Sequence, residues 1–221
     1  MFRNITNQKI TDYINSFYEP LSSELGELRK QAEEDNVPII LKDSEALLVS
    51  LLNIKRPVKI LEVGTAIGYS ALVMSAALPD AEIYTVERDE EIHAKAVTNV
   101  NKFGKSGQIV LLKGDATEEI LKLAELENPP SFDFIFIDAG KSKYKEFFDA
   151  ALKLADKNAM IVCDNMLFKG RIASEEYDEG KKYKTTIRKM REFLDYLYSL
   201  DGYHTSYLSV GDGVTITTKQ L

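Results

Sequence analysis

The chain has 221 residues, 44% of them hydrophobic, which is enough to bury one substantial core. Its formal net charge of −7 argues against broad, non-specific nucleic-acid binding, because that binding needs a positive field. Residues 141–191 depart from this balance, with 13 Lys and Arg against 8 Asp and Glu, so this window carries +5 and the remainder −12. Such a surplus most often marks a solvated helix face.

No apolar segment approaches the ~20 residues that a membrane span requires, and we expect neither a signal peptide nor a membrane partner. The single cysteine, Cys163, excludes an internal disulfide, which is typical of the reducing cytoplasm. The chain contains no linker, repeat or low-complexity tract. We therefore expect one domain over 1–221, with a helical extension (1–56) and an α/β core (57–221).

Apolar residues at helical spacing predict three helices in the extension, at about 7–17, 21–34 and 44–52. The third is predicted to be capped by Asp43 or Ser44.

From residue 58 the pattern changes to short apolar runs that alternate with helical patterns. The runs at 58–64, 82–87, 108–115, 132–140 and 159–165 are typical of buried strands, and the predicted helices cover 69–78, 89–103, the stretch to about 127, and 143–155. Near-continuous apolar strands between helices predict a parallel sheet with both faces covered.

A helix at about 184–198 is followed by two β-rich runs, 203–211 and 212–220, whose Asp-Gly junction predicts an antiparallel hairpin. The predicted fold class is therefore α/β and Rossmann-like. It has a mostly parallel, seven-stranded sheet, an antiparallel C-terminal hairpin and an N-terminal helical extension. In such sheets ligands bind beyond the carboxyl ends of the strands.

The first strand–helix turn, LEVGTAIGYS (61–70), contains Glu62, Gly64 and Gly68. Glycines there allow a tight turn and close backbone approach, but their spacing is not that of the dinucleotide fingerprint. Glu87 ends the second strand, where a carboxylate can accept hydrogen bonds from both ribose hydroxyls. Asp115 ends the third strand and would serve equally as a helix N-cap. Together these positions predict a nucleoside pocket.

Five segments together resemble the successive motifs of class I S-adenosylmethionine-dependent O-methyltransferases, in particular the metal-dependent catechol and caffeoyl-CoA type. They are LEVGTAIGYS, VERD, KGDA, FIDAGKSKY and CDNMLFKG, and the resemblance covers about residue 37 to the end. It implies a cofactor site with Glu62 and Gly64 at the methionine end beside Tyr69 and Ser70, Glu87 at the ribose, Asp115 and Ala116 at the adenine, and Asp138 close by.

Polar side chains also end the fourth and fifth predicted strands: Asp138 follows one, and Asp164 with Asn165 follows the other. Neighbouring parallel strands lie about 4.8 Å apart, so these groups can converge on one ion. Two carboxylates and one amide oxygen suit Mg²⁺ (or Mn²⁺) better than zinc, because neither Cys163 nor a histidine completes a zinc set. Each residue alone is equally typical of a helix cap or a turn. The resemblance implies the same three metal ligands.

A cation there would stabilise the oxyanion of an acceptor hydroxyl, which is mostly protonated at pH 7. The resemblance implies that Lys141 is the general base, although a surface lysine beside Lys143 and Lys145 is the plainer interpretation. Asp138 would act through the metal. Asp212 is interpreted as a turn residue, with an indirect role in shaping the site left open.

Chelation favours an acceptor with two adjacent oxygens, which a catechol and 5-hydroxyuridine both offer. Residues 164–197 resemble the bacterial tRNA 5-hydroxyuridine methyltransferases, which implies a tRNA anticodon region as partner. Basic side chains beside the metal residues could contact its phosphates, although four acidic residues (175, 176, 178 and 179) interrupt them. The basic residues are Lys169, Arg171, Lys181, Lys182, Lys184, Arg188, Lys189 and Arg191.

Three functions stay open at this point. The first is methylation of tRNA wobble 5-hydroxyuridine to 5-methoxyuridine, and the second is methylation of a small catechol or hydroxycinnamoyl compound. The third is a non-catalytic RNA-binding protein on the same fold. The habit of the resembled family further implies a homodimer.

Overall fold

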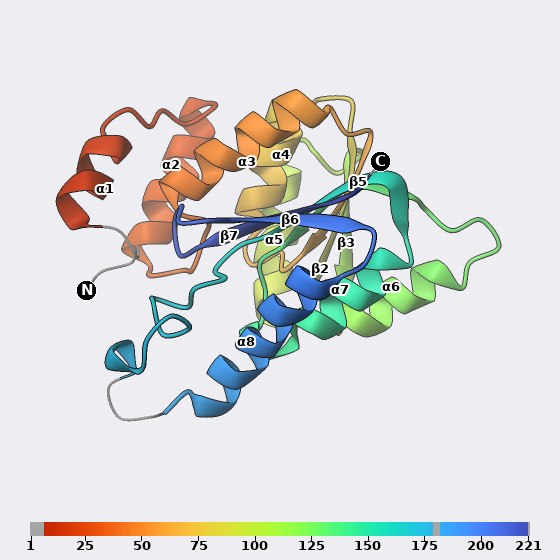
Figure 1. Cartoon of the computed structure of the whole chain (residues 1–221). Coiled ribbons are helices and arrows are strands. Elements are labelled where there is room, and N and C mark those ends of the chain that lie inside the picture. The colour runs from red at the N-terminus through yellow and green to blue at the C-terminus, as the bar shows by residue number, and fades with distance from the viewer. Residues whose placement is uncertain (1–6, 179–181, 221) are drawn as a thin grey trace.

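The computed structural model of the chain describes residues 7–178 and 182–220, and Figure 1 shows helices on both faces of a central sheet. In chain order the elements are α1 (Gln8–Asn15), α2 (Ser23–Glu34), α3 (Lys42–Lys55), β1 (Lys59–Val63), α4 (Tyr69–Ala77), β2 (Glu82–Glu87), α5 (Glu90–Lys102), β3 (Ile109–Lys113), α6 (Ala116–Ala124), β4 (Phe132–Ile137), the 3-10 turn η1 (Lys141–Lys143), α7 (Tyr144–Leu152), β5 (Ala155–Cys163), the 3-10 turn η2 (Glu175–Tyr177), α8 (Lys184–Ser199), β6 (Tyr203–Leu208) and β7 (Val214–Lys219).

The seven strands form one sheet in the order β3-β2-β1-β4-β5-β7-β6. The first five strands are parallel, and β7 runs antiparallel to both β5 and β6. The predicted fold class is therefore confirmed, including the antiparallel C-terminal strands. The chain reverses its direction of sheet growth between β1 and β4, and a ligand crevice forms at such a switch point.

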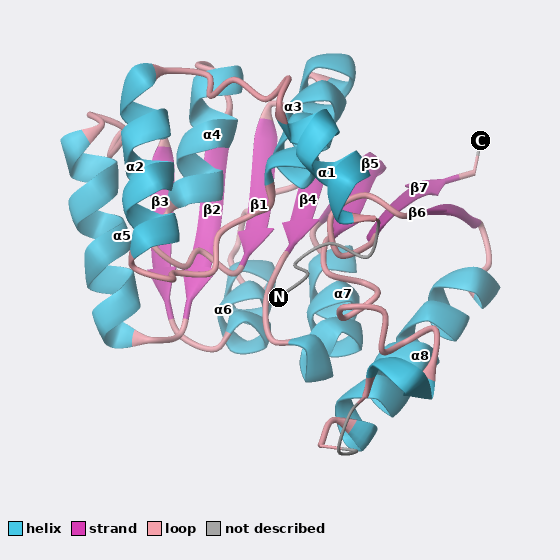
Figure 2. Cartoon of the chain, turned by 90° about the vertical axis from the view of Figure 1, so that its left-hand side faces the viewer, coloured by secondary structure: helices cyan, strands magenta, loops and turns pink. Residues whose placement is uncertain are grey.

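Side chains alternate between the two faces of each central strand, so every strand contributes to two apolar layers. Leu61 and Ile135 pack with residues of α6, α7 and α8, whereas Ile60 and Phe134 pack with residues of α2, α3 and α4. Figure 2 shows the sheet between these two groups of helices. Burial on both faces explains why the central strands are mostly apolar.

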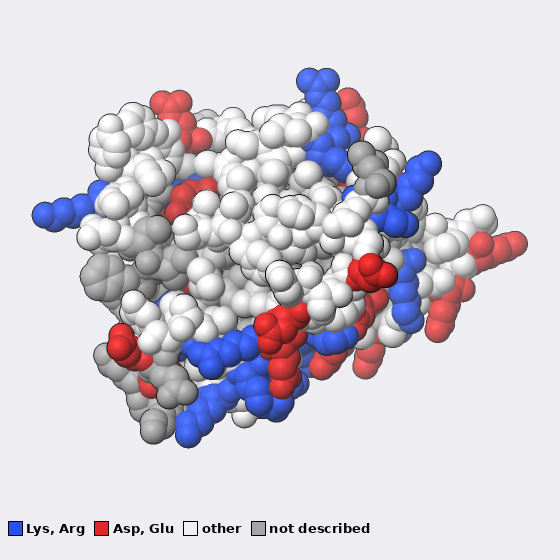
Figure 3. All heavy atoms as spheres, viewed as in Figure 1, with Lys and Arg blue, Asp and Glu red and all other residues white. Residues whose placement is uncertain are grey.

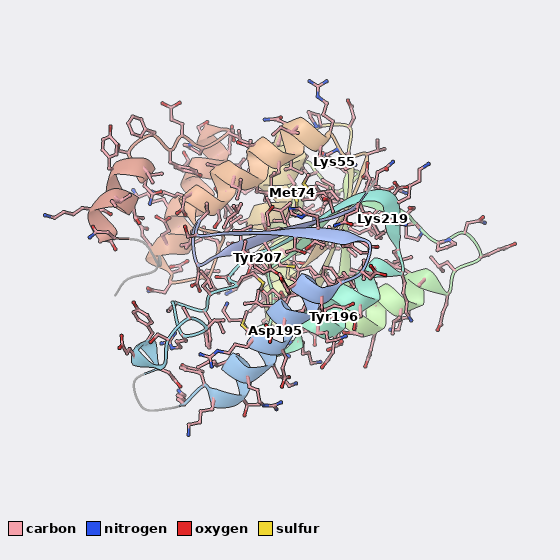
Figure 4. The ribbon with its side chains drawn as sticks, viewed as in Figure 1. Lys55, Met74, Asp195, Tyr196, Tyr207 and Lys219 are labelled. Atoms are coloured by element: carbon pink, nitrogen blue, oxygen red, sulfur yellow. The ribbon has the colours of Figure 1, made fainter. Side chains whose placement is uncertain are left out.

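The C-terminal hairpin is fastened to α8. Tyr207 of β6 lies over Asp195 and Tyr196 of α8 (Figure 4), and its hydroxyl donates a hydrogen bond to the backbone carbonyl of Leu194 (3.2 Å). The Tyr196 hydroxyl in turn donates to Asp149 of α7 (3.0 Å). Hydroxyl groups thus connect β6, α8 and α7 along one side of the sheet.

Two details of the predicted elements are wrong. Helix α3 begins at Lys42 after Leu41, and neither Asp43 nor Ser44 caps it, because their side chains reach instead to Gly211 (3.1 Å) and Asp164 (3.5 Å). Strand β5 begins at Ala155 rather than near 159. Ala155 is followed by three polar residues, Asp156, Lys157 and Asn158, which hid the start of the strand.

Within residues 7–178 and 182–220, no helix combines the length and the apolar composition that crossing a bilayer would require.

Candidate active site

A cavity of about 450 Å³ opens where β1, β2, β3 and β4 end, at the switch point of the sheet. The segment Pro38–Ile40, which precedes α3, completes its wall from the helical extension. Glu62 and Asp164 are not in the wall and are 0% and 2% exposed. The predicted residues that do line the cavity are Gly64, Tyr69, Ser70, Glu87, Asp115, Ala116, Asp138, Lys141 and Asn165.

The turn after β1 approaches the end of β4 so closely that only glycine fits at position 64. Gly64 has a φ of 106°, and a Cβ on it would lie 2.1 Å from the backbone oxygen of Asp138. This contact brings the first turn of the sheet against the residue predicted to bind the metal.

Glu62 is a fully buried carboxylate at the end of β1. Its Oε2 accepts a hydrogen bond from the Thr85 hydroxyl (2.5 Å), while no side chain in the described part of the chain bonds to Oε1. Burial raises the pKa of Glu62 to about 7. The open Oε1 is an acceptor that an ammonium group would satisfy.

Glu87 is oriented by backbone amides at the end of β2. Its Oε2 accepts from the amide of Ala66 (3.0 Å) and its Oε1 from the amide of Asp89 (2.9 Å). Each oxygen keeps a second lone pair, so the carboxylate can still bind a diol.

Asp115 caps α6, as its position after β3 predicted, and it also forms an ion pair. Its Oδ1 accepts from the amide of Thr117 (3.0 Å), and its Oδ2 lies 2.8 Å from Nζ of Lys143. The hydrogen bond from Lys143 holds the pKa of Asp115 below its usual range. The pair connects the ends of β3 and β4 on the cavity wall, and nothing in the sequence indicated it.

The predicted convergence of Asp138, Asp164 and Asn165 is confirmed as geometry. The amide Nδ2 of Asn165 donates to Oδ1 of Asp138 (2.5 Å), and its backbone amide donates to Oδ1 of Asp164 (2.7 Å). Burial, together with the carboxylate of Asp138, raises the pKa of Asp164 well above its usual range. Burial also raises the pKa of Asp138. Two carboxylates that repel each other in this way would be stabilised by a cation.

The donor set also fits a hard divalent ion. Among the described residues, no cluster of three or more His, Cys, Asp and Glu side chains offers a metal site, so a zinc-type set is absent there. The two carboxylates and one amide at the ends of β4 and β5 are oxygen donors of the kind Mg²⁺ and Mn²⁺ accept. The Asn165 amide would have to turn its carbonyl oxygen inward to become a ligand.

Buried neighbours fix this end of β5. The hydroxyl of Tyr144, which is 1% exposed, donates to the backbone carbonyl of Asp164 (2.8 Å). Asn165 has a φ of 60°, a left-handed conformation that asparagine tolerates better than most residues. Tyr144 therefore supports the site from within the core.

Lys141 lies beside the carboxylates. Its charge lowers the pKa of Asp138, Asp164 and Asp212, although burial has the larger, opposite effect on each. Its Nζ is 5.7 Å from the centre of the Phe168 ring. The structure thus brings the predicted base and the predicted metal ligands together.

A buried ion pair, which the sequence did not reveal, attaches the helical extension to the cavity. Arg29 of α2 pairs with Glu45 of α3, and its Nη2 donates to the backbone carbonyl of Ile40 (2.9 Å). Its Nε donates to the hydroxyls of Tyr18 (3.0 Å) and Tyr69 (3.1 Å). Because Ile40 and Tyr69 line the cavity, this cluster shapes its wall.

Part of the predicted basic rim lies beside the cavity. Lys189 of α8 donates to the backbone carbonyl of Ser142, which lines the cavity (3.3 Å). In Figure 3, Lys and Arg side chains gather over α8 with acidic side chains among them. Arg188, for example, pairs with Glu192 (2.7 Å). Lys181 lies outside the described residues.

The strand order, with a nucleoside-sized cavity at its switch point, is the Rossmann-like methyltransferase fold, which the chain shares with solved O-methyltransferase structures. Residues 15–220 match the family model described as O-methyltransferase. The chain therefore belongs to the O-methyltransferase family, and it is an S-adenosylmethionine-dependent O-methyltransferase.

Known relatives place it among the catechol and caffeoyl-CoA group. A caffeoyl-CoA O-methyltransferase of Populus kitakamiensis is 31% identical over 216 residues, covering 94% of this chain and 91% of the relative. A catechol O-methyltransferase of Niastella koreensis is 38% identical over 121 residues, 54% of each chain. A Staphylococcus aureus structure, provisionally called a caffeoyl-CoA O-methyltransferase, superimposes with a TM-score of 0.85 at 27% identity, covering 96% of this chain and 98% of that one.

Proposed function

We propose that the protein methylates one hydroxyl of a vicinal-oxygen acceptor in a divalent-metal-dependent reaction. The observation that carries this proposal is the meeting of Asp138, Asp164 and Asn165 at the ends of adjacent strands beside the cofactor cavity. These residues would hold Mg²⁺ or Mn²⁺. Such an ion supplies stabilisation of the acceptor oxyanion and fixes the orientation of a chelating acceptor.

The chain's own groups handle the proton and the cofactor. The neutral amine of Lys141 would accept the hydroxyl proton at Nζ, after which the acceptor oxygen takes the methyl group from the sulfonium and S-adenosylhomocysteine remains. The cofactor would lie against Gly64, with Glu62, Tyr69 and Ser70 at its methionine end. Glu87, already oriented by two amides, would bind the ribose, and Asp115 with Ala116 would face the adenine beside Asp138.

For the acceptor, we favour 5-hydroxyuridine at the wobble position of tRNA. The support is the basic α8, whose Lys189 contacts the segment that follows Lys141. A small acceptor is the alternative, because the relatives are named for caffeoyl-CoA, flavonoids and catechol. Nucleoside mass spectrometry of tRNA from cells lacking the protein separates the two. Loss of 5-methoxyuridine supports the tRNA reaction, whereas unchanged tRNA together with transfer to a catechol supports the small acceptor.

Charge reversal tests the contact with RNA directly. Lys182→Glu with Lys184→Glu should weaken methyl transfer to tRNA by about tenfold or more, since phosphate contacts carry much of such affinity. Transfer to a free catechol should be unchanged. The control is Lys95→Glu with Lys102→Glu, which makes the same change of charge on exposed positions of α5. Equal loss in both double variants would remove the support for an RNA-contacting rim.

The chain also offers a surface for the expected homodimer in the cytoplasm. Ile10, Tyr13, Ile14 and Phe17 recur at helical spacing on α1 and its end, and they are 50–70% exposed. A contiguous apolar stripe of this kind is typical of an interface. Sedimentation should show a dimer that Tyr13→Ser with Phe17→Ser converts to a monomer; a wild-type monomer at every concentration would contradict the proposal.

A further inference from the structure

The turn between β6 and β7 contacts the loop that follows the metal residues. The backbone oxygen of Asp212 accepts from the amide of Leu167 (2.8 Å), and that of Gly213 accepts from the amide of Met166 (2.9 Å). The Asp212 carboxylate accepts from the amide of Lys169. Asp212 lies in a turn, as the sequence predicted, and it is only 3% exposed.

The same turn is also held by the start of α3. The amide of Gly211 donates to Oδ2 of Asp43 (3.1 Å), and a Cβ on Gly211 would lie 2.1 Å from Oγ of Ser44. Ser44 in turn donates to Oδ1 of Asp164 (3.5 Å). The turn is therefore packed between the start of α3 on one side and residues 166–169 on the other.

The loop adopts a conformation that needs such support. Phe168 and Lys169 have φ values of 46° and 56°, in the left-handed region that bulky residues rarely adopt. Backbone of this kind persists where its surroundings fix it. A hydrogen bond from the Lys169 amide to a buried side-chain oxygen of Asp212 fixes this backbone, because losing the acceptor would leave the amide unsatisfied.

The side chain at this point of the loop contacts the proposed base. The Phe168 ring lies 5.7 Å from Nζ of Lys141 and 5.0 Å from the guanidinium carbon of Arg171, and it packs edge-on against Tyr183 (5.1 Å between centroids). The position of this ring follows from the backbone that Asp212 holds. A change at Asp212 should therefore shift the Phe168 ring that contacts Lys141.

We propose that Asp212 is a positioning residue for the acceptor side of the site. Through the Lys169 amide it holds Phe168 under Lys141, and it acts by its hydrogen bond rather than by its charge. The inference rests on the proposed function, in which Lys141 takes part in methyl transfer.

Three variants of the full-length chain test it: Asp212→Ala, Asp212→Asn, and Asp201→Ala as a control at an exposed turn before β6. For Asp212→Ala we expect kcat to fall by about tenfold or more with the acceptor KM changed less, since misplaced catalytic groups affect the transition state most. Affinity for S-adenosylhomocysteine should stay within about twofold of wild type, because substitutions at sites without shared partners act almost independently.

Amide hydrogen exchange followed by NMR gives a readout that does not depend on activity. The Lys169 amide should exchange about tenfold faster in Asp212→Ala, because it loses its buried acceptor. Asp212→Asn keeps an oxygen that can accept from Lys169, so it should restore both the slow exchange and most of kcat. If the alanine variant does not fold, Asp212→Ser, whose shorter side chain falls short of the amide, takes its place.

Unchanged Lys169 exchange in the alanine or serine variant would overturn the inference. So would an asparagine variant as impaired as alanine, because the effect would then come from charge. If the proposed function itself is wrong, the wild-type protein transfers no methyl group to any vicinal-oxygen acceptor, yet Lys169 exchange still decides whether Asp212 holds the loop.

Discussion

The guanidinium Nε of Arg29 lies 3.1 Å from the hydroxyl of Tyr69, so a helix of the N-terminal extension bonds directly to the wall of the cofactor cavity. Arg29 is 4% exposed, and its partner Glu45 is 2% exposed. The extension is therefore part of the site rather than an accessory to it.

Replacing Arg29 by methionine should lower the free energy of unfolding by about 3–5 kcal/mol, because the buried Glu45 would lose its cationic partner. Urea denaturation measures the change. The matched control is Lys30→Met, the next residue of α2, whose pair with Glu34 is 79% and 59% exposed. That variant should stay within about 0.5 kcal/mol of wild type. Equal stability of the two variants would contradict a structural role for the buried pair.

Gly64→Ala should abolish binding of S-adenosylhomocysteine and destabilise the fold by more than about 3 kcal/mol, since a left-handed φ and a backbone clash act together. Isothermal titration and thermal unfolding provide the two measurements. Gly107→Ala is the control, because Gly107 has no left-handed φ, nothing within 4 Å of its added Cβ, and no place in the cavity wall. Normal cofactor binding by Gly64→Ala would show that the turn can move away from Asp138.

Glu62 should make the stability of the cofactor-free protein depend on pH. Its pKa of about 7 in the folded state exceeds the usual 4.5, so the folded state holds a proton that the unfolded state releases. The contribution of Glu62 to the free energy of unfolding should therefore be fully present below pH 4.5. It should be lost as the pH rises through 7, and the loss should total about 3 kcal/mol.

The measurement is the difference between wild type and Glu62→Gln in urea denaturation from pH 5 to pH 8. Asp138 and Asp164 also have raised pKa values, but both carboxyls are present in both proteins, so the difference reports on Glu62 and its interaction with Asp138. Parallel curves for the two proteins would mean that Glu62 is ionised across this range.

Removing the charge of one metal-binding carboxylate should impair metal binding without impairing cofactor binding. Asp164→Asn should reduce methyl transfer by about 100-fold or more, because several kcal/mol of oxyanion stabilisation depend on the metal. Binding of S-adenosylhomocysteine should persist. Saturating Mg²⁺, at about 100 times its dissociation constant, should stabilise wild type by about 2.7 kcal/mol and leave the variant unchanged.

Asp156→Asn, near the other end of β5, is the control and should respond to Mg²⁺ as wild type does. Full activity of the wild-type protein in metal-free buffer would contradict the metal role altogether.

The sequence predicted features that follow from periodicity. Apolar runs located the strands, and the parallel order implied that Asp138 and Asp164 would meet, since the carboxyl ends of parallel strands lie at one edge. These inferences needed only the spacing of residue types. The cap of α3 was predicted wrongly because Asp43 and Ser44 have partners far along the chain, and a local rule cannot see them.

The contacts that the sequence missed all join distant segments. Asp212 and Lys169 are 43 residues apart, and Lys143 and Asp115 are 28 apart. Arg29 lies four residues before Glu33, so on sequence grounds it resembles an ordinary surface pair of a helix. Which of many charged side chains becomes buried depends on how the elements pack, and residue spacing within one element does not contain that information.

The position of β7 has a consequence for synthesis of the protein. In the part of the chain that the structure describes, β6 bonds to β7 alone, and β7 occupies the place beside β5 although it follows β6 in the chain. Until β7 has left the ribosome, β6 has no partner strand and β5 keeps an open edge. Open edges attract strands of other molecules. The nascent protein should therefore be most prone to aggregation in the interval before β7 is released from the ribosome, and chaperones would be needed most then.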